Sequence, residues 1–262
     1  MISWATAAVA AAAGLVVGDY LTVVIERAPE ATTVAGSLRE LGPAPAGRCP
    51  RCATRLRATE LVPLASWAAG GGQCRHCGER YGGWHPAAEA LTAVTFGLIG
   101  LRFGASPVLP AFCYLAAVAV ALAFIDVAHR RLPDLLTLPS YPVAIVALGA
   151  ATPFVRHGPA HLAHAAIGLA CAFAFYLILA LVYPAGIGWG DVKLSGLLGL
   201  YLGWIGFSAL VIGLAAGFVL AAGAGLALLA TGRATRTSQI AFGPYMLAGA
   251  LVVVIAFGAA GT

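Results

Sequence analysis

Long apolar segments, separated by shorter polar ones, make up most of this chain. Within these segments apolar residues follow one another without the alternation expected of a strand that has one solvated face. Backbone groups inside a bilayer must be hydrogen-bonded internally, and uninterrupted apolar segments achieve this as helices. The pattern therefore predicts an all-α polytopic membrane protein.

Eight transmembrane helices are predicted from these segments. Residues 194–231 carry no charged side chain and are too long for one span of about 20 residues. We therefore expect two helices that meet near Gly203-Trp204-Ile205-Gly206, the first of which is short unless it begins near Asp191. The other predicted spans are 2–25, 86–103, 108–125, 135–153, 161–183 and 240–260.

Composition and the placement of charge support a membrane protein. The chain is 61% hydrophobic and 10% charged, with a mean hydropathy of +0.91, whereas soluble domains carry about 25% charged residues. Thirteen of the fifteen Lys and Arg residues fall within 26–85, 128–134, 184–193 and 232–239. Such an excess is typical of cytoplasmic loops, so we expect these segments in the cytoplasm and both termini outside. The same placement points to lipid contact and argues against nucleic-acid binding, despite a net charge of +5.

The glycine-rich segment Gly186–Lys193 contains Asp191, the last acidic residue of the chain. A charge at the edge of a membrane-length segment is costly and is by default a candidate functional group. Gly188 and Gly190 lack Cβ atoms and would let another backbone approach that carboxylate closely. In the predicted topology Asp126 ends the third span on the same membrane face where Asp191 begins the sixth.

Two such carboxylates suggest a specific chemistry. In a low-dielectric site they share one proton, because both cannot easily ionise. The ionised member can take a proton from water while the protonated member hydrogen-bonds the scissile carbonyl oxygen. Asp126 and Asp191 are therefore candidate catalytic residues of an aspartic endopeptidase, a mechanism that needs neither a metal nor a covalent intermediate.

Other roles remain open for the charged groups at this face. Asp126 could instead form an interfacial ion pair with Arg130-Arg131. Lys193 cannot share a helix face with Asp191, two residues away, and is expected to anchor its span at the lipid headgroups.

Four further residues within the spans are assigned structural roles. Asp19 and Glu89 are expected to hydrogen-bond between helices. Cys113 and Cys171 lie in the middle of spans and are expected to be core residues.

Two C-x2-C pairs, Cys49/Cys52 and Cys74/Cys77, lie in the polar segment 26–85. Four thiolates at about this spacing bind zinc tetrahedrally. Two disulfides or free thiols are the alternatives, and a cytoplasmic location disfavours disulfides. Since metal binding supplies folding free energy that so small a domain lacks, the sequence predicts a cytoplasmic zinc-ribbon-like domain with a structural zinc.

Taken together, these motifs resemble the prepilin peptidases, or type IV leader peptidases, which are membrane aspartic proteases of the G-x-G-D class. The matching segments are Gly18–Arg27, the two cysteine pairs with Ser66-Trp67 between them, His85–Ala93, Phe124–Asp126 with Leu132–Asp134, Gly188–Leu194 and Phe242–Tyr245. The resemblance implies that Asp126 and Asp191 are the catalytic pair, supported by Gly188, Gly190 and Lys193.

The resemblance also implies a substrate class and a location. Members cleave the basic leader of type IV prepilins or type II secretion pseudopilins after a glycine, at the cytoplasmic face of the bacterial inner membrane. Many then methylate the new N-terminus with S-adenosylmethionine, and methylation is associated with members that have the cysteine domain.

The sequence thus favours a bifunctional prepilin peptidase and N-methyltransferase. Residues 1–25 would form the first transmembrane helix, 26–85 the zinc domain and 86–262 a seven-helix peptidase domain. A peptidase without methylation is one alternative. Another is a non-enzymatic transporter or proton channel with the zinc domain as a docking module, whose relay carboxylates would be staggered across the bilayer and not gathered at one face.

Overall fold

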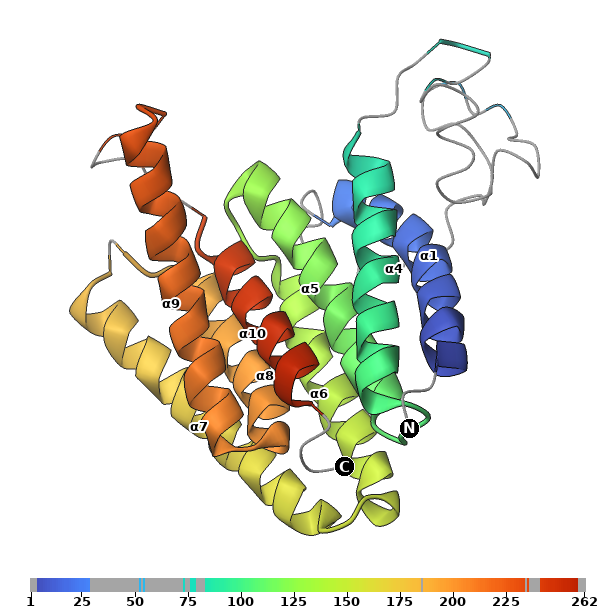
Figure 1. The fold of residues 1–262 in the computed structure, drawn as a ribbon. Coiled ribbons are helices and arrows are strands. Elements are labelled where there is room, and N and C mark those ends of the chain that lie inside the picture. Colours follow the sequence, from blue (N-terminus) through green and yellow to red (C-terminus); the bar gives the residue numbers. More distant parts are fainter. Residues whose placement is uncertain are drawn as a thin grey trace.

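A computed structural model describes residues 4–28, 52, 54, 73, 76–78, 83–184, 186–233, 235 and 241–258. Over these residues the chain forms eight α-helices and one 3-10 helix (Figure 1). The elements are α1 (Trp4–Arg27), α4 (Trp84–Phe103), α5 (Leu109–His129), α6 (Asp134–Ala151), η2 (Thr152–Phe154), α7 (Gly158–Val182), α8 (Trp189–Ile205), α9 (Phe207–Ala230) and α10 (Gly243–Phe257).

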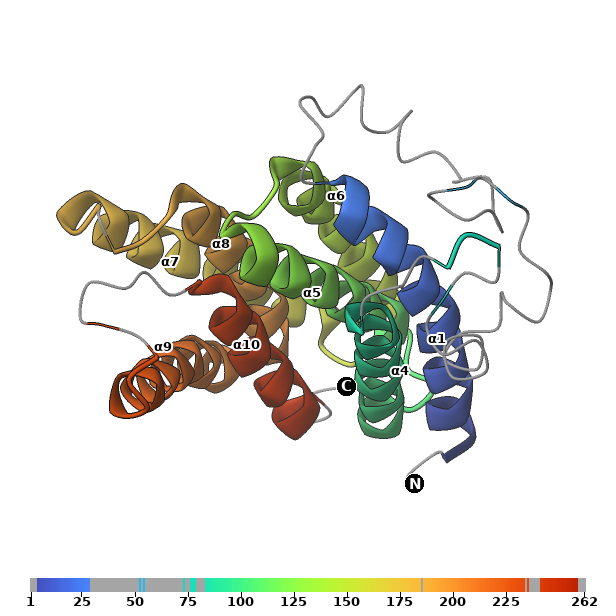
Figure 2. The ribbon, with the colours of Figure 1, turned by 90° about the horizontal axis from the view of Figure 1, so that it is seen from above.

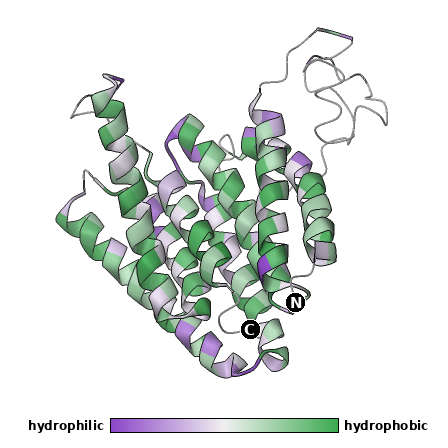
Figure 3. Cartoon of the chain, viewed as in Figure 1, coloured by the Kyte–Doolittle hydropathy of each residue, from purple (hydrophilic) through white to green (hydrophobic). Residues whose placement is uncertain are grey.

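Five helical segments are long and apolar enough to cross a membrane: α1, α5, α6 with η2, α7 and α9. Of the other three, α8 and α10 have 17 and 15 residues, and α4 includes Glu89 and Arg102. Hydrophobic residues dominate the length of the helices (Figure 3), and many large apolar side chains are exposed, as lipid contact requires. Examples are Val16, Val146, Ile178, Val219 and Leu226. The helical membrane architecture is confirmed, whereas the count of eight spans stays a prediction.

Successive helices run in alternating directions (Figure 1). The α5–α6 and α7–α8 connections therefore lie at the same end of the bundle as the start of α10. Viewed from above, α5 runs between the α1–α4 pair on one side and the α7–α8 pair on the other (Figure 2). This alternation brings the C-terminal end of α5 and the N-terminal end of α8 to one end of the molecule.

Glycines let neighbouring helices approach at backbone distance. A Cβ added at Gly18 of α1 would lie 2.7 Å from the Cα of Glu89 in α4. A Cβ at Gly199 of α8 would lie 2.4 Å from the carbonyl oxygen of Gly168 in α7. Small residues at helix contacts are a principal means of association where no hydrophobic effect drives it. They also fix which residues of the two helices face each other.

The predicted division of the long uncharged segment is confirmed. α8 ends at Ile205, and Gly206 has a φ of 150°, a conformation that side-chain-bearing residues rarely adopt. α8 begins at Trp189, so the helix includes Asp191 in its first turn.

One predicted loop boundary is wrong. Asp134 was expected within the loop 128–134, but it is the first residue of α6 and follows Pro133 in an extended conformation. An acidic side chain in the first turn is stabilised by the helix dipole, and proline favours the extended conformation that precedes a helix. The helical part of the last predicted span is also shorter than expected, at Gly243–Phe257.

Candidate active site

Asp126 and Asp191 lie at helix ends that meet at one end of the bundle. Asp126 is in the last turn of α5 and Asp191 in the first turn of α8. Their exposed fractions are 5% and 9%. The two are close enough for the charge of Asp126 to act on Asp191. The structure therefore brings the two predicted site carboxylates together at one depth, and does not stagger them along the bundle.

Each carboxylate accepts a hydrogen bond from a backbone N–H that belongs to a glycine. The N–H of Gly243, the first residue of α10, donates to Asp126. The N–H of Gly188 donates to Oδ2 of Asp191 at 3.3 Å. Asp191 is thus a first-turn residue that reaches back to the residue before its helix, where the N–H groups have no helical partner. Backbone donors of this kind partly replace the water that a buried carboxylate has lost.

The glycines of the site also make room for neighbouring groups. A Cβ at Gly243 would lie 2.7 Å from Oδ2 of Asp126, and one at Gly190 would lie 3.0 Å from the Cβ of Leu132. Leu132 is in the α5–α6 connection and also lies 3.4 Å from the position of a Gly243 Cβ. Its side chain therefore extends between the glycines that flank the two aspartates.

The structure adds Gly243 and Leu132 to the residues singled out from the sequence. Both occur in segments that match the family motifs. Nothing in the sequence alone shows that they approach Asp126 and Asp191, the pair of carboxylates called the dyad below. Glycine followed by proline is a common start to a helix, so the sequence at Gly243 and Pro244 gives no sign of the contact with Asp126.

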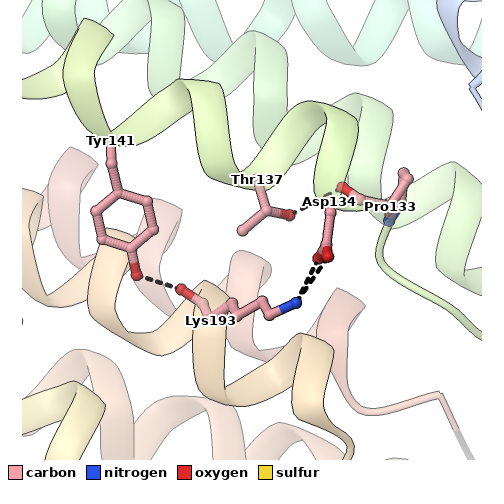
Figure 4. Close-up of polar contacts among 5 residues, drawn as sticks. All are labelled: Pro133, Asp134, Thr137, Tyr141 and Lys193. Atoms are coloured by element: carbon pink, nitrogen blue, oxygen red, sulfur yellow. Dashed lines mark hydrogen bonds and ion pairs between the residues drawn. The ribbon is translucent and has the colours of Figure 1, made fainter. Parts of the chain in front are cut away.

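Lys193 ties α8 to α6 (Figure 4). Its Nζ lies 2.7 and 2.8 Å from the two carboxylate oxygens of Asp134. The hydroxyl of Tyr141, two turns further along α6, donates to the backbone carbonyl of Lys193. The interhelical ion pair fixes α8 two residues after Asp191. The expected anchoring of Lys193 at the lipid headgroups stays a prediction.

Asp19 and Glu89 lie apart from this site, on the α1–α4 pair. Glu89 is buried at the point where Gly18 meets α4. Asp19 is exposed and lies within electrostatic reach of His85, whose Nε2 is 3.1 Å from a carboxylate oxygen of Glu26.

The predicted zinc ligands fall largely on residues that the structure does not describe. Cys49 and Cys74 lie outside the described residues, and only Cys52 and Cys77 lie within them. Among the described residues no group of three or more potential ligands is gathered, so the zinc site stays a prediction. Cys113 is partly buried, as expected for a residue near the core, but Cys171 is exposed on α7. The position of Cys171 in the middle of a span predicted its depth along the helix and not the side of the helix on which it lies.

Comparison with known proteins covers nearly the whole chain. Residues 12–103 match the Bacterial Peptidase A24 N-terminal domain, and residues 113–259 match the Type IV leader peptidase family. No solved structure matches significantly.

Three relatives, each named "Prepilin leader peptidase/N-methyltransferase", show the extent of the similarity. The protein of Stutzerimonas stutzeri is 32% identical over 249 residues, covering 89% of this chain and 84% of the relative. That of Burkholderia pseudomallei (strain 1026b) is 35% identical over 263 residues, covering 90% and 81%. That of Bacillus subtilis (strain 168) is 30% identical over 215 residues, covering 80% and 81%.

The contact between Gly243 and Asp126 predicts an effect on stability. Gly243→Ala places a methyl group against the carboxylate and should lower the free energy of unfolding by about 1–3 kcal/mol, as overpacking does. The control is Gly149→Ala in α6, where an added Cβ meets nothing within 4 Å and the helix should gain up to about 1 kcal/mol. Denaturant unfolding in detergent micelles measures both, and equal stabilities of the two variants would contradict the close contact.

Proposed function

The chain belongs to the type IV leader peptidase family, and we propose that it removes the leader from prepilins or pseudopilins and then methylates the new N-terminus. The observation that carries this proposal is the pairing of Asp126 with Asp191 at one end of the bundle. Two buried carboxylates within electrostatic reach of each other are the catalytic groups of an aspartic endopeptidase. The names of the relatives supply the substrate class and the second reaction.

In the proposed reaction the two carboxylates hold one proton between them. The ionised carboxylate takes a proton from water as the water oxygen bonds to the carbonyl carbon of the scissile peptide. The protonated carboxyl group gives its proton to the carbonyl oxygen. When the tetrahedral intermediate collapses, the C–N bond breaks, the amine leaves with a proton and a new carboxyl group remains. One water is consumed, and the dyad returns to its starting protonation.

The scaffold around the dyad would hold both groups in this geometry. Gly188 and Gly243 each donate a backbone N–H to one carboxylate, which limits rotation of the side chains. The Lys193–Asp134 ion pair fixes the first turns of α8 against α6. Gly190 leaves space for Leu132. We assign Gly188, Gly190 and Lys193 to this supporting role.

Methylation uses the amine that cleavage exposes. S-adenosylmethionine would supply the methyl group, and the new amine would accept it with loss of a proton to water. An uncleaved substrate offers no free amine at the correct residue, so cleavage must come before methylation.

Asp126→Asn and Asp191→Asn should each abolish leader cleavage. Asparagine is nearly isosteric with aspartate but cannot exchange the proton, and residues that act as a unit do not lose activity additively. The double variant should therefore be no worse than either single one. Mass spectrometry of a prepilin peptide incubated with purified protein measures cleavage.

Asp19→Asn is the matched control for these variants, because it changes an exposed acid on α1 and should leave cleavage intact. Robust cleavage by either dyad variant, in a preparation free of host peptidase, would remove the dyad assignment.

A structural zinc in segment 26–85 is the next part of the proposal. Cys49, Cys52, Cys74 and Cys77 would hold it; four thiolates are a donor set that suits zinc and closes its coordination sphere. Such an ion would stabilise this segment and take no part in peptide hydrolysis.

Purified protein should contain one zinc per chain, and Cys49→Ser or Cys77→Ser should lose it. Both variants should also make the polar segment more sensitive to limited proteolysis, since metal binding contributes to folding. Cys171→Ser, at an exposed position on α7, is the control and should keep its zinc. Unchanged metal content after replacement of all four ligand cysteines would exclude the site.

Localisation in the bacterial inner membrane, with the dyad at the cytoplasmic face, completes the proposal. This orientation is supported by Lys193 and by the arginines of the α5–α6 connection and of the segment after α9, because positive residues favour the cytoplasmic side. The first span, the zinc domain and the seven-helix peptidase domain would then occupy residues 1–25, 26–85 and 86–262.

Reporter fusions test this orientation. A reporter after Arg57 should be cytoplasmic and one after Ala260 should be outside, because seven spans separate the two positions. Activity of an externally folding reporter, such as alkaline phosphatase, distinguishes them. Reporters on the same side of the membrane would contradict the eight-span arrangement.

A further inference from the structure

Tyr176 on α7 is a buried polar group near the dyad that the reaction described above does not use. Its exposed fraction is 0%, and its hydroxyl has no hydrogen-bond partner among the described residues. Buried polar groups are almost always paired, so an unpaired one requires an explanation, and a catalytic role is one of the few available.

The register of the α7–α8 pair places Tyr176 opposite Asp191. A Cβ at Gly203 would lie 2.5 Å from the carbonyl oxygen of His164, and one at Gly199 would lie 2.4 Å from that of Gly168. One turn further, the Ser195 hydroxyl donates to the carbonyl of Ala172 at 3.2 Å. The facing residues thus advance by four along one helix and go back by four along the other. The next facing pair is Tyr176 and Asp191.

Electrostatics agree with this register. The charge of Asp191 acts on the Tyr176 hydroxyl, although no direct hydrogen bond joins the two side chains. The hydroxyl of Tyr176 therefore lies near the carboxylate of Asp191, and its O–H group remains available to donate a hydrogen bond.

Aromatic packing holds the tyrosine ring on the side of the site where α10 begins. The ring stacks on Phe218 of α9 with centroids 5.6 Å apart, and lies 6.2 Å from the ring of Phe242. Phe242 directly precedes Gly243, whose N–H binds Asp126. The ring of Tyr176 is thus packed against α9 and against the residue that precedes α10, and its hydroxyl lies within electrostatic reach of Asp191.

We propose that Tyr176 is a third catalytic residue, whose hydroxyl donates a hydrogen bond to the scissile carbonyl oxygen as negative charge develops on it. This inference rests on the proposed peptidase function. A fixed donor in a low-dielectric site stabilises the transition state without reorganising when the reaction occurs. No proton is transferred from the phenol: it donates a hydrogen bond alongside the protonated carboxyl group and is unchanged when the intermediate collapses.

Burial of Tyr176 is consistent with this role because the whole site is closed. The two aspartates are themselves 5% and 9% exposed, so a peptide must open the same space to reach any of the three groups. Until then the hydroxyl has no substrate oxygen to bind. An interaction made only in the transition state raises kcat without tightening substrate binding.

Tyr176→Phe separates the catalytic role from a structural one. The change removes only the hydroxyl. If that group acts on the transition state, kcat for leader cleavage should fall by about 100-fold, as on removal of one oxyanion donor, with KM unchanged. The melting temperature should stay the same or rise, because the variant loses no hydrogen bond found among the described residues and no longer buries an unpaired hydroxyl.

Tyr201→Phe is the matched control. Tyr201 lies on α8, is also fully buried, and its hydroxyl is likewise without a partner among the described residues. It is ten residues from Asp191, about 15 Å along the helix. The same substitution there should leave kcat and KM at wild-type values.

Steady-state cleavage of a prepilin peptide and thermal unfolding of each purified variant distinguish the outcomes. Wild-type cleavage that is lost in Asp191→Asn establishes the peptidase function in the same assay. With that established, a Tyr176→Phe variant with the kcat of Tyr201→Phe overturns the proposal. So does a variant that changes only KM, or one whose lost cleavage accompanies a lower melting temperature. A wild-type protein that leaves the peptide intact overturns the peptidase function itself.

Discussion

The structure depends on keeping two carboxylates away from water without leaving them unsatisfied. A buried charge is expensive unless hydrogen bonds or another charge compensate for it. Here each aspartate lies at a helix terminus and accepts an N–H from a glycine, Gly188 for Asp191 and Gly243 for Asp126. These donors come from chain segments that end or begin at the same end of the bundle. The dyad therefore needs three helices, α5, α8 and α10, to be placed correctly at once.

Close helix packing provides that placement. The backbone contacts of Gly168 with Gly199, and of Gly18 with α4, leave little freedom for one helix to slide along its neighbour. Sliding α8 by one turn would move Asp191 by about 5.4 Å and break both its pairing with Asp126 and the Lys193–Asp134 ion pair. Packing along the middle of the bundle thus determines the geometry of a site at its end, and the Lys193–Asp134 ion pair reinforces it locally (Figure 4).

Much of this arrangement could be predicted from the sequence because it follows from local rules. Uncharged segments predicted the helices, and Gly206 interrupted the longest one where a change of direction was expected. The meeting of Asp126 and Asp191 followed from counting spans. By contrast, the roles of Leu132, Gly243 and Tyr176 depend on which faces of distant helices meet, and one sequence contains no record of those contacts. Two predictions were wrong for a similar reason: Cys171 was expected in the core and Asp134 in a loop. The depth of a residue along the bundle specifies neither the side of the helix on which it lies nor the residue at which a helix begins.

The alternating direction of the helices has a consequence for how chains of this architecture can vary. α5 ends, and α8 begins, at the same end of the bundle because two helices, α6 and α7, lie between them (Figure 1). The constraint is one of parity. Inserting or deleting a helical hairpin between the two aspartates keeps both at the same end of the bundle, whereas inserting or deleting a single helix sends Asp191 to the opposite end. The number of residues between Asp126 and Asp191 can therefore vary, but the number of helices between them must stay even.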